Sequence, residues 1–247
     1  MGADEAMTER PSGEQVIVSS RAAFVLEWGA RAAIVAIFTA LAALNLAGIY
    51  HMAPLDGPEW LLAVAARFAN FMFLILVAAT ALTRLSPVLK AKGIEPRVSA
   101  LLGTFISAGL VLLPKTELGP VLSIISTLLI ITGAVLSFIV LRWLGKSFSI
   151  LAEARRLVTT GPYKVVRHPL YLCEGVALLG VVLQVISPLA VAMTLIIALI
   201  QFRRMINEEA VLNSAFPEYR AYAARTPRVA PALLAGFYSG SKSAVKE

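Results

Sequence analysis

Two short stretches near the C-terminal end hold most of the side chains that could bind or activate a polar ligand. The first, residues 161–171, reads G-P-Y-K-V-V-R-H-P-L-Y. Its Gly-Pro pair favours a turn, because a residue before proline avoids the helical region. Pro169 suits the first position of a helix, so we expect His168 at the helix N-terminus. The free amides and positive dipole end there would attract an anionic group such as a carboxylate.

The second stretch, residues 203–209, reads R-R-M-I-N-E-E. In a continuous helix Arg204 and Glu208 share a face, because they are four residues apart. At 1.5 Å per residue Glu208 lies about 9 Å beyond Phe202, the last residue of an apolar block. Singly, an Arg-His pair at a membrane edge or a Glu-Glu pair on a helix is usually a surface feature. Together and in this order they indicate one ligand site.

Long apolar blocks must position these two stretches. The chain has 247 residues, of which 58% are hydrophobic and 15% charged, whereas soluble domains carry about 25% charged residues. A bilayer core about 30 Å thick needs roughly 20 apolar helical residues. We therefore predict an all-α integral membrane protein with about six transmembrane helices, at residues 30–50, 60–82, 98–113, 118–141, 170–186 and 189–202. The third, fifth and sixth are short, and Ser187-Pro188 is expected to bend the chain between the last two.

Basic residues fix the expected orientation. Of the 22 Lys and Arg residues, all except Arg67 and Lys115 fall in four regions: 1–31, 84–97, 142–167 and 203–247. The positive-inside bias therefore predicts a bacterial inner-membrane protein with both termini and the active site in the cytoplasm. The net charge of +7 is then mainly a topological signal, with some attraction to membrane lipid. We expect no nucleic-acid partner.

Charged residues inside the predicted spans need a reason. Glu27 and Arg31, four residues apart at the start of the first span, are expected to form an ion pair. Arg67 and Asn70 lie inside the second span, where charge is expensive and faces protein or water. We interpret Arg67 as a contact between helices or as a side chain that reaches the interface.

Cysteine and histidine are too few to indicate metal or disulfide chemistry. Cys173 is the only cysteine, so no intrachain disulfide can form, and packing in the fifth span is its expected role. The two histidines, His51 and His168, lie far apart without the spacing of metal ligands. We predict no metal site.

The composition changes at Trp143 and suggests four regions. We predict a disordered cytoplasmic tail at 1–20 and four transmembrane helices at 21–142. A catalytic region at 143–231 contains a transmembrane hairpin between two polar segments, and a C-terminal tail follows at 232–247. A short helix is expected at 218–224, after the break at Phe216-Pro217.

In combination these residues resemble the isoprenylcysteine carboxyl methyltransferase family and its relatives, which include phosphatidylethanolamine N-methyltransferases. The resemblance covers about residues 143–231 and rests on these matches: L-V-T-T-G-P-Y at 157–163, R-H-P-L-Y at 167–171, Glu208-Glu209, Phe216, Tyr219, Tyr222 and T-P-R at 226–228. It implies a membrane methyltransferase that uses S-adenosyl-L-methionine without the soluble nucleotide-binding fold. Consistently, no Gly-x-Gly-x-x-Gly motif follows a strand. One departure is Cys173, followed by Glu174, where relatives often have glycine.

The resemblance also implies a donor pocket formed by the cytoplasmic C-terminal segments. Its members would be Glu153, Arg155, Arg156, Leu157, Val158, Gly161, Tyr163, His168, Pro169, Leu170, Tyr171 and Glu208. His168 and Tyr171 would face the amino-acid part of the donor, and Glu208 its ammonium or ribose hydroxyls. The candidate catalytic residues are Arg204, which would position the acceptor, with Glu209 and Arg167.

The acceptor is expected to be lipophilic and to enter between the helices. A carboxylate acceptor, the first expectation, is nucleophilic at neutral pH, and Arg204 could orient it through paired hydrogen bonds. An amine or thiol would need a base, for which Glu209 or Glu174 is a candidate. Other classes stay open: methylation of a phospholipid or a small hydrophobic N or S acceptor, a sterol-reductase-like enzyme with NADPH phosphate at Arg155-Arg156, and a non-catalytic scaffold or transporter.

Overall fold

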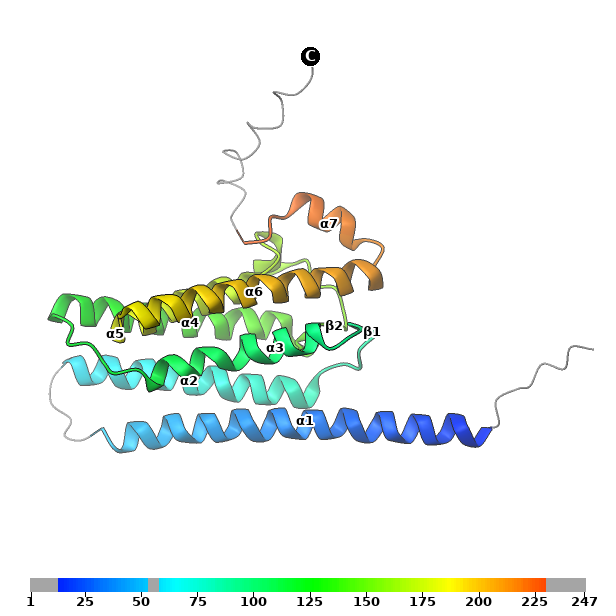
Figure 1. The fold of residues 1–247 in the computed structure, drawn as a ribbon, viewed down its shortest axis with the longest axis horizontal. Coiled ribbons are helices and arrows are strands. Elements are labelled where there is room, and N and C mark those ends of the chain that lie inside the picture. Colours follow the sequence, from blue (N-terminus) through cyan, green and yellow to red (C-terminus); the bar gives the residue numbers. More distant parts are fainter. Residues whose placement is uncertain (1–12, 53–57, 230–247) are drawn as a thin grey trace, which may run out of the picture.

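The computed structural model describes residues 13–52 and 58–229, and in this part of the chain six apolar helical segments form one bundle (Figure 1). The prediction of an all-α membrane protein is therefore confirmed. The first two helices are α1 (Gly13–Tyr50) and α2 (Pro58–Thr83). Helix α1 begins inside the stretch 1–20 that we expected to be disordered, whereas residues 1–12 and the predicted tail at 232–247 lie outside the described residues.

The third span changes helix type on its way through the bundle. Helix α3 (Glu95–Phe105) continues directly into a 3₁₀ segment, η1 (Ile106–Leu112). A 3₁₀ helix rises about 2.0 Å per residue instead of 1.5 Å, so the two segments together reach about 30 Å. This length matches the hydrocarbon core of a bilayer. The stretched second half explains how a predicted span this short can cross.

The last three spans are α4 (Pro120–Leu144), α5 (Pro169–Gln184) and α6 (Pro188–Ala215). Proline begins each of them, and Ser187 caps α6 by accepting a hydrogen bond from the Ala190 amide at 3.1 Å. Helix α5 has only 16 residues, or about 24 Å, whereas α6 has 28 residues, or about 42 Å. Helix α6 thus continues past its apolar part, as expected, and carries Arg204 and Glu208 beyond it.

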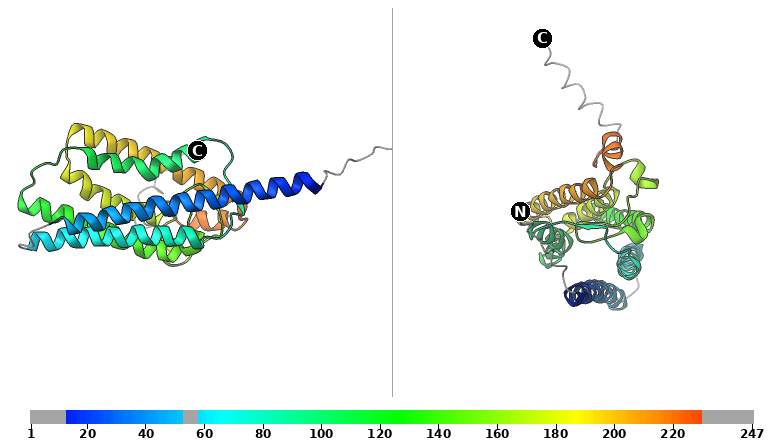
Figure 2. Two further views of the ribbon diagram at one scale, coloured as in Figure 1. Left: turned by 90° about the horizontal axis from the view of Figure 1, so that it is seen from below. Right: turned by 90° about the vertical axis from the view of Figure 1, so that its right-hand side faces the viewer.

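The helices pack as a row beside a pair. Helix α1 packs on α2, α2 on α4 and α4 on α5, while α3 packs on α6, as the end-on view in Figure 2 illustrates. The contact between α4 and α5 is close because glycines remove side chains there. A Cβ atom at Gly133 would lie 2.4 Å from the Ala177 amide nitrogen, and one at Gly180 would lie 2.6 Å from the Ser126 carbonyl oxygen.

The polar segments gather at one end of the bundle, where α7 and both short strands lie in Figure 1. Strands β1 (Leu89–Lys90) and β2 (Glu153–Ala154) pair antiparallel. Two 3₁₀ turns, η2 (Gly145–Ser147) and η3 (Gly161–Lys164), flank β2, and α7 (Tyr219–Arg225) closes the end. The short helix that we predicted at 218–224 thus exists. These segments come from the basic regions of the sequence.

The outer surface of the bundle is apolar. Large hydrophobic side chains stand exposed on several helices, for example Leu44 at 68%, Val121 at 70% and Leu199 at 71%. Within residues 13–52 and 58–229, five helical segments are long and apolar enough to cross a membrane, namely Glu27–Tyr50, Trp60–Thr83, Glu95–Leu112, Pro120–Ser147 and Pro188–Ala215. An exposed apolar surface of this extent requires lipid around it. The chain is an integral membrane protein.

Candidate active site

A cavity of about 1360 Å³, here called the chamber, lies between the helices and reaches the polar end of the bundle. Its helical part is lined by apolar side chains such as Phe38, Phe73 and Phe105. Its polar end is lined by side chains from the two stretches singled out in the sequence, including Tyr171 and Glu208. The chamber therefore offers one apolar compartment and one polar compartment that communicate.

The chamber collects most of the residues that the sequence pointed to. Twelve of them line it: Glu153, Arg155, Arg156, Leu157, Val158, Tyr163, Arg167, His168, Leu170, Tyr171, Arg204 and Glu208. Gly161, Pro169 and Glu209 are not part of the wall. Gly161 and Pro169 shape the backbone that carries the wall, and Glu209 sits behind it.

The backbone before α5 is fixed by a tight glycine turn and by hydrogen bonds to residues that follow α7. Gly161 has a φ of +59°, and a Cβ atom there would lie 2.1 Å from the Trp143 ring, so only glycine fits the turn. The amides of Arg167 and His168 donate to the carbonyls of Pro227 and Arg228 at 2.9 and 3.1 Å. These contacts fix His168 at the N-terminus of α5, where the sequence predicted it.

Glu209 is the centre of a buried ion cluster. Its carboxylate accepts two hydrogen bonds from Arg228, at 2.8 and 2.9 Å, and one from Arg167 at 2.8 Å. The His168 Nε2 atom lies 3.0 Å from the same group. Bidentate and charge-assisted contacts of this kind are strong, and they raise the pKa of Arg228. The structure brings Arg167 and Glu209 together, but in an arrangement that ties the loop before α5 to residues after α7.

Glu208 faces the chamber instead. It accepts a hydrogen bond from the Tyr171 hydroxyl, and its second oxygen lies 3.8 Å from His168 Nδ1. The His168 and Tyr171 rings meet edge to face, with centroids 5.4 Å apart. A quarter of the Glu208 side chain stays exposed. One carboxylate, one imidazole and one phenol therefore converge on the same polar space, as predicted.

Arg204 separates the polar end from the apolar part of the chamber. It is 8% exposed, and its guanidinium lies 5.2 Å from the centroid of the Tyr171 ring. It donates to the Gln201 side chain at 3.0 Å and to the Ile150 carbonyl at 3.2 Å, while its Nε has no partner among the described residues. A Cβ atom at Gly103 would lie 2.4 Å from Arg204 Cδ, so glycine on α3 leaves the room for this side chain.

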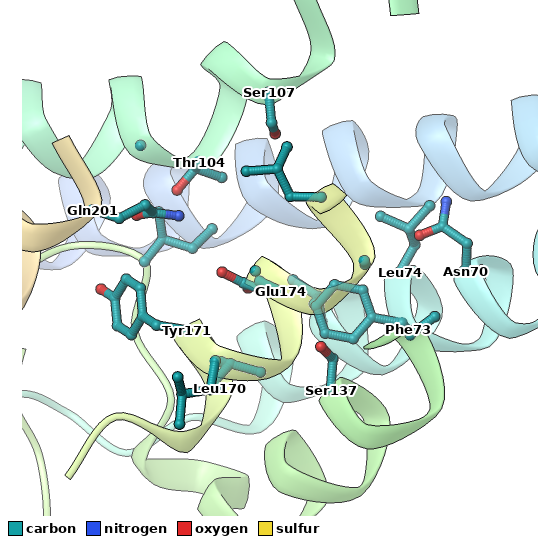
Figure 3. A pocket seen from close by; sticks show the side chains of 18 of the residues that line it. Asn70, Phe73, Leu74, Thr104, Ser107, Ser137, Leu170, Tyr171, Glu174 and Gln201 are labelled. Carbon is teal, nitrogen blue, oxygen red and sulfur yellow. The ribbon is translucent and has the colours of Figure 1, made fainter. Parts of the chain in front are cut away.

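Glu174 is an ionisable residue of α5 that also lines the chamber. Figure 3 shows it pointing into the same space as Tyr171 and Gln201, across from Thr104 and Ser107. It lies three residues after Tyr171 and so shares its face of α5. None of the hydrogen bonds among the described residues ends on its carboxylate. The sequence marked Glu174 as unusual, but Gln201, Thr104 and Ser107 gave no signal, because single polar residues in apolar helices are common.

The loop after α4 forms the remaining polar wall. Glu153 accepts hydrogen bonds from Ser149 at 2.9 Å and from Arg155 at 2.5 Å. Tyr163 is buried, and its carbonyl accepts a hydrogen bond from the Tyr222 hydroxyl at 2.7 Å. Burial raises the pKa of the Tyr163 phenol, so it stays protonated at physiological pH and acts as a donor or an aromatic wall, never as a base.

Comparisons with known proteins agree with this site. Residues 115–219 match the family model described as phospholipid methyltransferase. A stretch of 83 residues is 41% identical to the nickel-cobalt-cadmium resistance protein NccN of Alcaligenes xylosoxydans xylosoxydans, covering 33% of this chain and 38% of that protein. A stretch of 79 residues is 43% identical to the cobalt-zinc-cadmium resistance protein CzcN of Cupriavidus metallidurans, covering 31% and 36%. The chain thus matches little more than a third of the length of these relatives. No solved structure matches significantly.

The family match contains α4, α5 and α6, together with the loops that form the polar end of the chamber. It begins earlier than the resemblance seen in the sequence, because it includes the whole of α4. It ends at Tyr219, the first residue of α7. The part of the chain that is similar to the phospholipid methyltransferase family, residues 115–219, is therefore also the part that forms most of the polar end of the chamber.

Proposed function

We propose that this protein is an S-adenosyl-L-methionine-dependent methyltransferase that acts on a lipophilic acceptor at the cytoplasmic side of the membrane. The observation that supports it most is the chamber, which joins a polar compartment at Glu208 to an apolar compartment between the helices. The family match supports the methyltransferase class. The cytoplasmic orientation rests on the distribution of basic residues.

The polar compartment suits the methyl donor. Glu208, still a quarter exposed, is placed to accept from an ammonium group or from ribose hydroxyls. His168 and Tyr171 lie beside it, and Tyr163 closes the wall. When bound, S-adenosyl-L-methionine supplies a methyl group on a sulfonium, whose sulfur keeps the bonding electrons as the methyl group leaves in line. The residues of this chain align the two reactants and exclude water, which is most of what such a transfer requires.

Donor binding is the first test. Calorimetry on the detergent-purified protein should show binding of S-adenosylhomocysteine, and His168→Ala and Glu208→Ala should each weaken it at least tenfold. Arg142→Ala is the matched control, since Arg142 is exposed at the end of α4 and does not line the chamber. Binding of NADPH in place of S-adenosylhomocysteine would overturn the proposal and favour the reductase alternative.

The acceptor class is a separate question, and a specific observation favours a second candidate. For a carboxylate acceptor, Arg204 is the residue placed to orient it, and its Nε has no partner in the part of the chain that the structure describes. However, Glu174 stands in the same space, no ion pair among the described residues involves it, and an ionised Glu174 would repel a carboxylate. An amine acceptor reverses this effect, because Glu174 can hold the ammonium form and then take its proton, which leaves the free amine and its lone pair to attack the methyl group.

The two acceptor classes make different predictions for two conservative variants. With an amine acceptor, Glu174→Gln should lower turnover at least tenfold, and raising the pH should restore part of it. With a carboxylate acceptor, Arg204→Lys should raise KM strongly, whereas Glu174→Gln should leave turnover unchanged or increase it. Methylation of lipid extracts with radiolabelled donor, followed by base lability of the product, distinguishes a methyl ester from a methylated amine.

The two relatives are named for resistance to nickel, cobalt, cadmium or zinc. In residues 13–52 and 58–229, no three His, Cys, Asp or Glu side chains lie together in a way that could hold a metal ion.

A further inference from the structure

A group of arginines beside the proposed donor pocket has more positive charge than the carboxylates of the described residues neutralise. Arg31 on α1, Arg84 directly after α2 and Arg155 directly after β2 are 8%, 7% and 5% exposed. Together with Ser147, they form what we call the arginine junction. Arg31 donates to the Leu82 carbonyl at 3.3 Å, which ties α1 to the end of α2.

Backbone contacts bring the other members to the same place. The Leu85 amide donates to the Lys146 carbonyl at 2.9 Å, so Ser147 lies next to the chain that leaves α2. The Val88 amide donates to the Ala154 carbonyl at 2.7 Å, which places Arg155 against the same segment. Two segments far apart in the sequence thus meet around Arg84.

The junction contains hydrogen-bond donors that have no acceptor among the described residues. Among the described residues, eight buried side-chain atoms lack a partner, and five of them are here: Arg31 Nε, Arg84 Nε, Ser147 Oγ, Arg155 Nε and Arg155 Nη1. A buried donor left without a partner costs roughly 1–3 kcal/mol, and more when it is charged. Such a concentration of unsatisfied donors in one place indicates a ligand that accepts hydrogen bonds.

The charge balance indicates that this ligand is an anion. Glu27 pairs with Arg31 at 2.8 Å, and Glu153 pairs with Arg155 and with Lys90, the latter at 3.8 Å. No carboxylate among the described residues pairs with Arg84. Burial is the largest effect and lowers the pKa of Arg84; the charges of Arg155 and Arg31 lower it further, while those of Glu153 and Glu27 oppose the shift.

The position of the junction, at the ends of two apolar helical segments, indicates the kind of anion. The apolar segment Glu27–Tyr50 begins here and Trp60–Thr83 ends here. Trp28, which is 49% exposed, lies under the Arg31 guanidinium at 5.2 Å from the ring centroid. Exposed tryptophan and arginine are typical of the membrane interface, where lipid phosphates lie.

We propose that the arginine junction binds a phosphate group, supplied by an anionic lipid headgroup of the cytoplasmic leaflet or by free phosphate. The phosphate accepts from the unsatisfied donors of Arg84, Arg155 and Ser147, and it ties the ends of α1 and α2 to the loop that follows α4. Arg155 and Ser147 also line the chamber, whereas Arg31 and Arg84 do not. The site thus adjoins the proposed donor pocket and shares Arg155 with it, but two of its three arginines lie outside the chamber, and its existence does not depend on the methyltransferase proposal.

The test measures the thermal unfolding midpoint of the full chain in delipidated detergent micelles. Dioleoylphosphatidylglycerol is titrated against diolein, which has the same tails without phosphate, and inorganic phosphate is titrated at constant ionic strength. We expect the midpoint to rise with phosphatidylglycerol and not with diolein. Arg84→Gln should weaken this response at least tenfold, whereas Arg142→Gln, the same charge change at an exposed position, should leave it intact.

Each of the remaining outcomes either supports or overturns the proposed phosphate site. A rise with inorganic phosphate, lost in Arg84→Gln, supports the site and identifies free phosphate as sufficient; a rise with the lipid alone identifies the headgroup. If Arg84→Gln fails to fold, Ser147→Ala keeps every charge and should still weaken the response severalfold. Equal effects of phosphatidylglycerol and diolein, or equal losses in Arg84→Gln and Arg142→Gln, would overturn the proposal. So would competition by S-adenosylhomocysteine, because the junction would then hold the donor's carboxylate.

Discussion

Two adjacent glutamates have opposite surroundings, and this difference predicts different phenotypes. Glu209 neutralises Arg167 and Arg228 behind the chamber wall, whereas Glu208 faces the chamber. Glu209→Gln leaves two guanidinium groups without a full counter-charge, and breaking a buried pair costs about 3–5 kcal/mol. We expect a clearly lower thermal unfolding midpoint for Glu209→Gln and an unchanged midpoint for Glu208→Gln. Glu218→Gln, on an exposed position, is the control. Equal midpoints for Glu208→Gln and Glu209→Gln would contradict the assignment.

Tyr222 predicts a dependence of stability on alkaline pH. Burial, with the nearby Tyr219, raises the pKa of Tyr222 to about 12, above the value of about 10 for an unfolded tyrosine. A group whose pKa is raised by folding stabilises the folded state below the unfolded pKa, and this contribution is lost as the pH rises through the folded pKa. The unfolding midpoint should therefore fall between about pH 10 and pH 12. In Tyr222→Phe, which lacks the hydrogen bond to Tyr163, the midpoint should be lower at neutral pH and should fall less steeply.

For individual residues, the sequence predicted which side chains lie close together, but not the role of each one. Twelve predicted site residues line the chamber, because turn chemistry at 161–169 and helical spacing at 204–208 are local properties. The sequence alone could not distinguish the role of Glu208 from that of Glu209. Neighbouring residues on a helix point about 100° apart, and only the packing of Arg228, far along the chain, decides which carboxylate is enclosed. In the same way, the surroundings of Glu174 are set by residues on other helices, namely Thr104 and Gln201.

At the scale of elements, the contact between α4 and α5 predicts that small residues there are needed for the site. Gly133→Val places a side chain 2.4 Å from the α5 backbone, so the helices must separate and move Tyr171 and Glu174. We expect a lower unfolding midpoint together with weaker binding of S-adenosylhomocysteine. Gly175→Ala is the matched control, since nothing lies within 4 Å of its Cβ position and alanine favours a helix. A Gly133→Val protein with normal donor binding would show that the close contact does not position the site.

The elements also show which parts of the fold were predictable. Hydrophobic blocks located all six apolar helical segments, and Pro169 located the start of α5. The 3₁₀ conformation of η1 was not predictable, because its residues differ little in composition from those of an α-helical span. It follows from tertiary packing against α5 and α6, where Leu110 is fully buried.

At the scale of the whole molecule, the chamber and the polar end depend on each other. The row of α1, α2, α4 and α5 and the pair of α3 and α6 leave the apolar compartment between them. The basic loops that the positive-inside bias keeps on one side are the same segments that close the chamber there. If the positive-inside bias holds for this chain, the residues that set its orientation also bring the proposed donor site to the cytoplasm, where a soluble methyl donor is found.

Because the proposed donor site lies at the polar end of the bundle, the proposed function predicts the membrane topology. If both termini are cytoplasmic, Lys92, in the loop after β1, faces the cytoplasm, and Glu117, between η1 and α4, faces the opposite side. Both side chains are exposed. Cys173 is first replaced by alanine, and single cysteines are then placed at these two positions. In intact cells an impermeant maleimide should label Glu117→Cys, whereas Lys92→Cys should react only after permeabilisation. The reverse pattern would place the polar end outside the cell and remove the supply of donor. Labelling of both from one side would show that α3 and η1 together do not cross the bilayer, despite a length of about 30 Å.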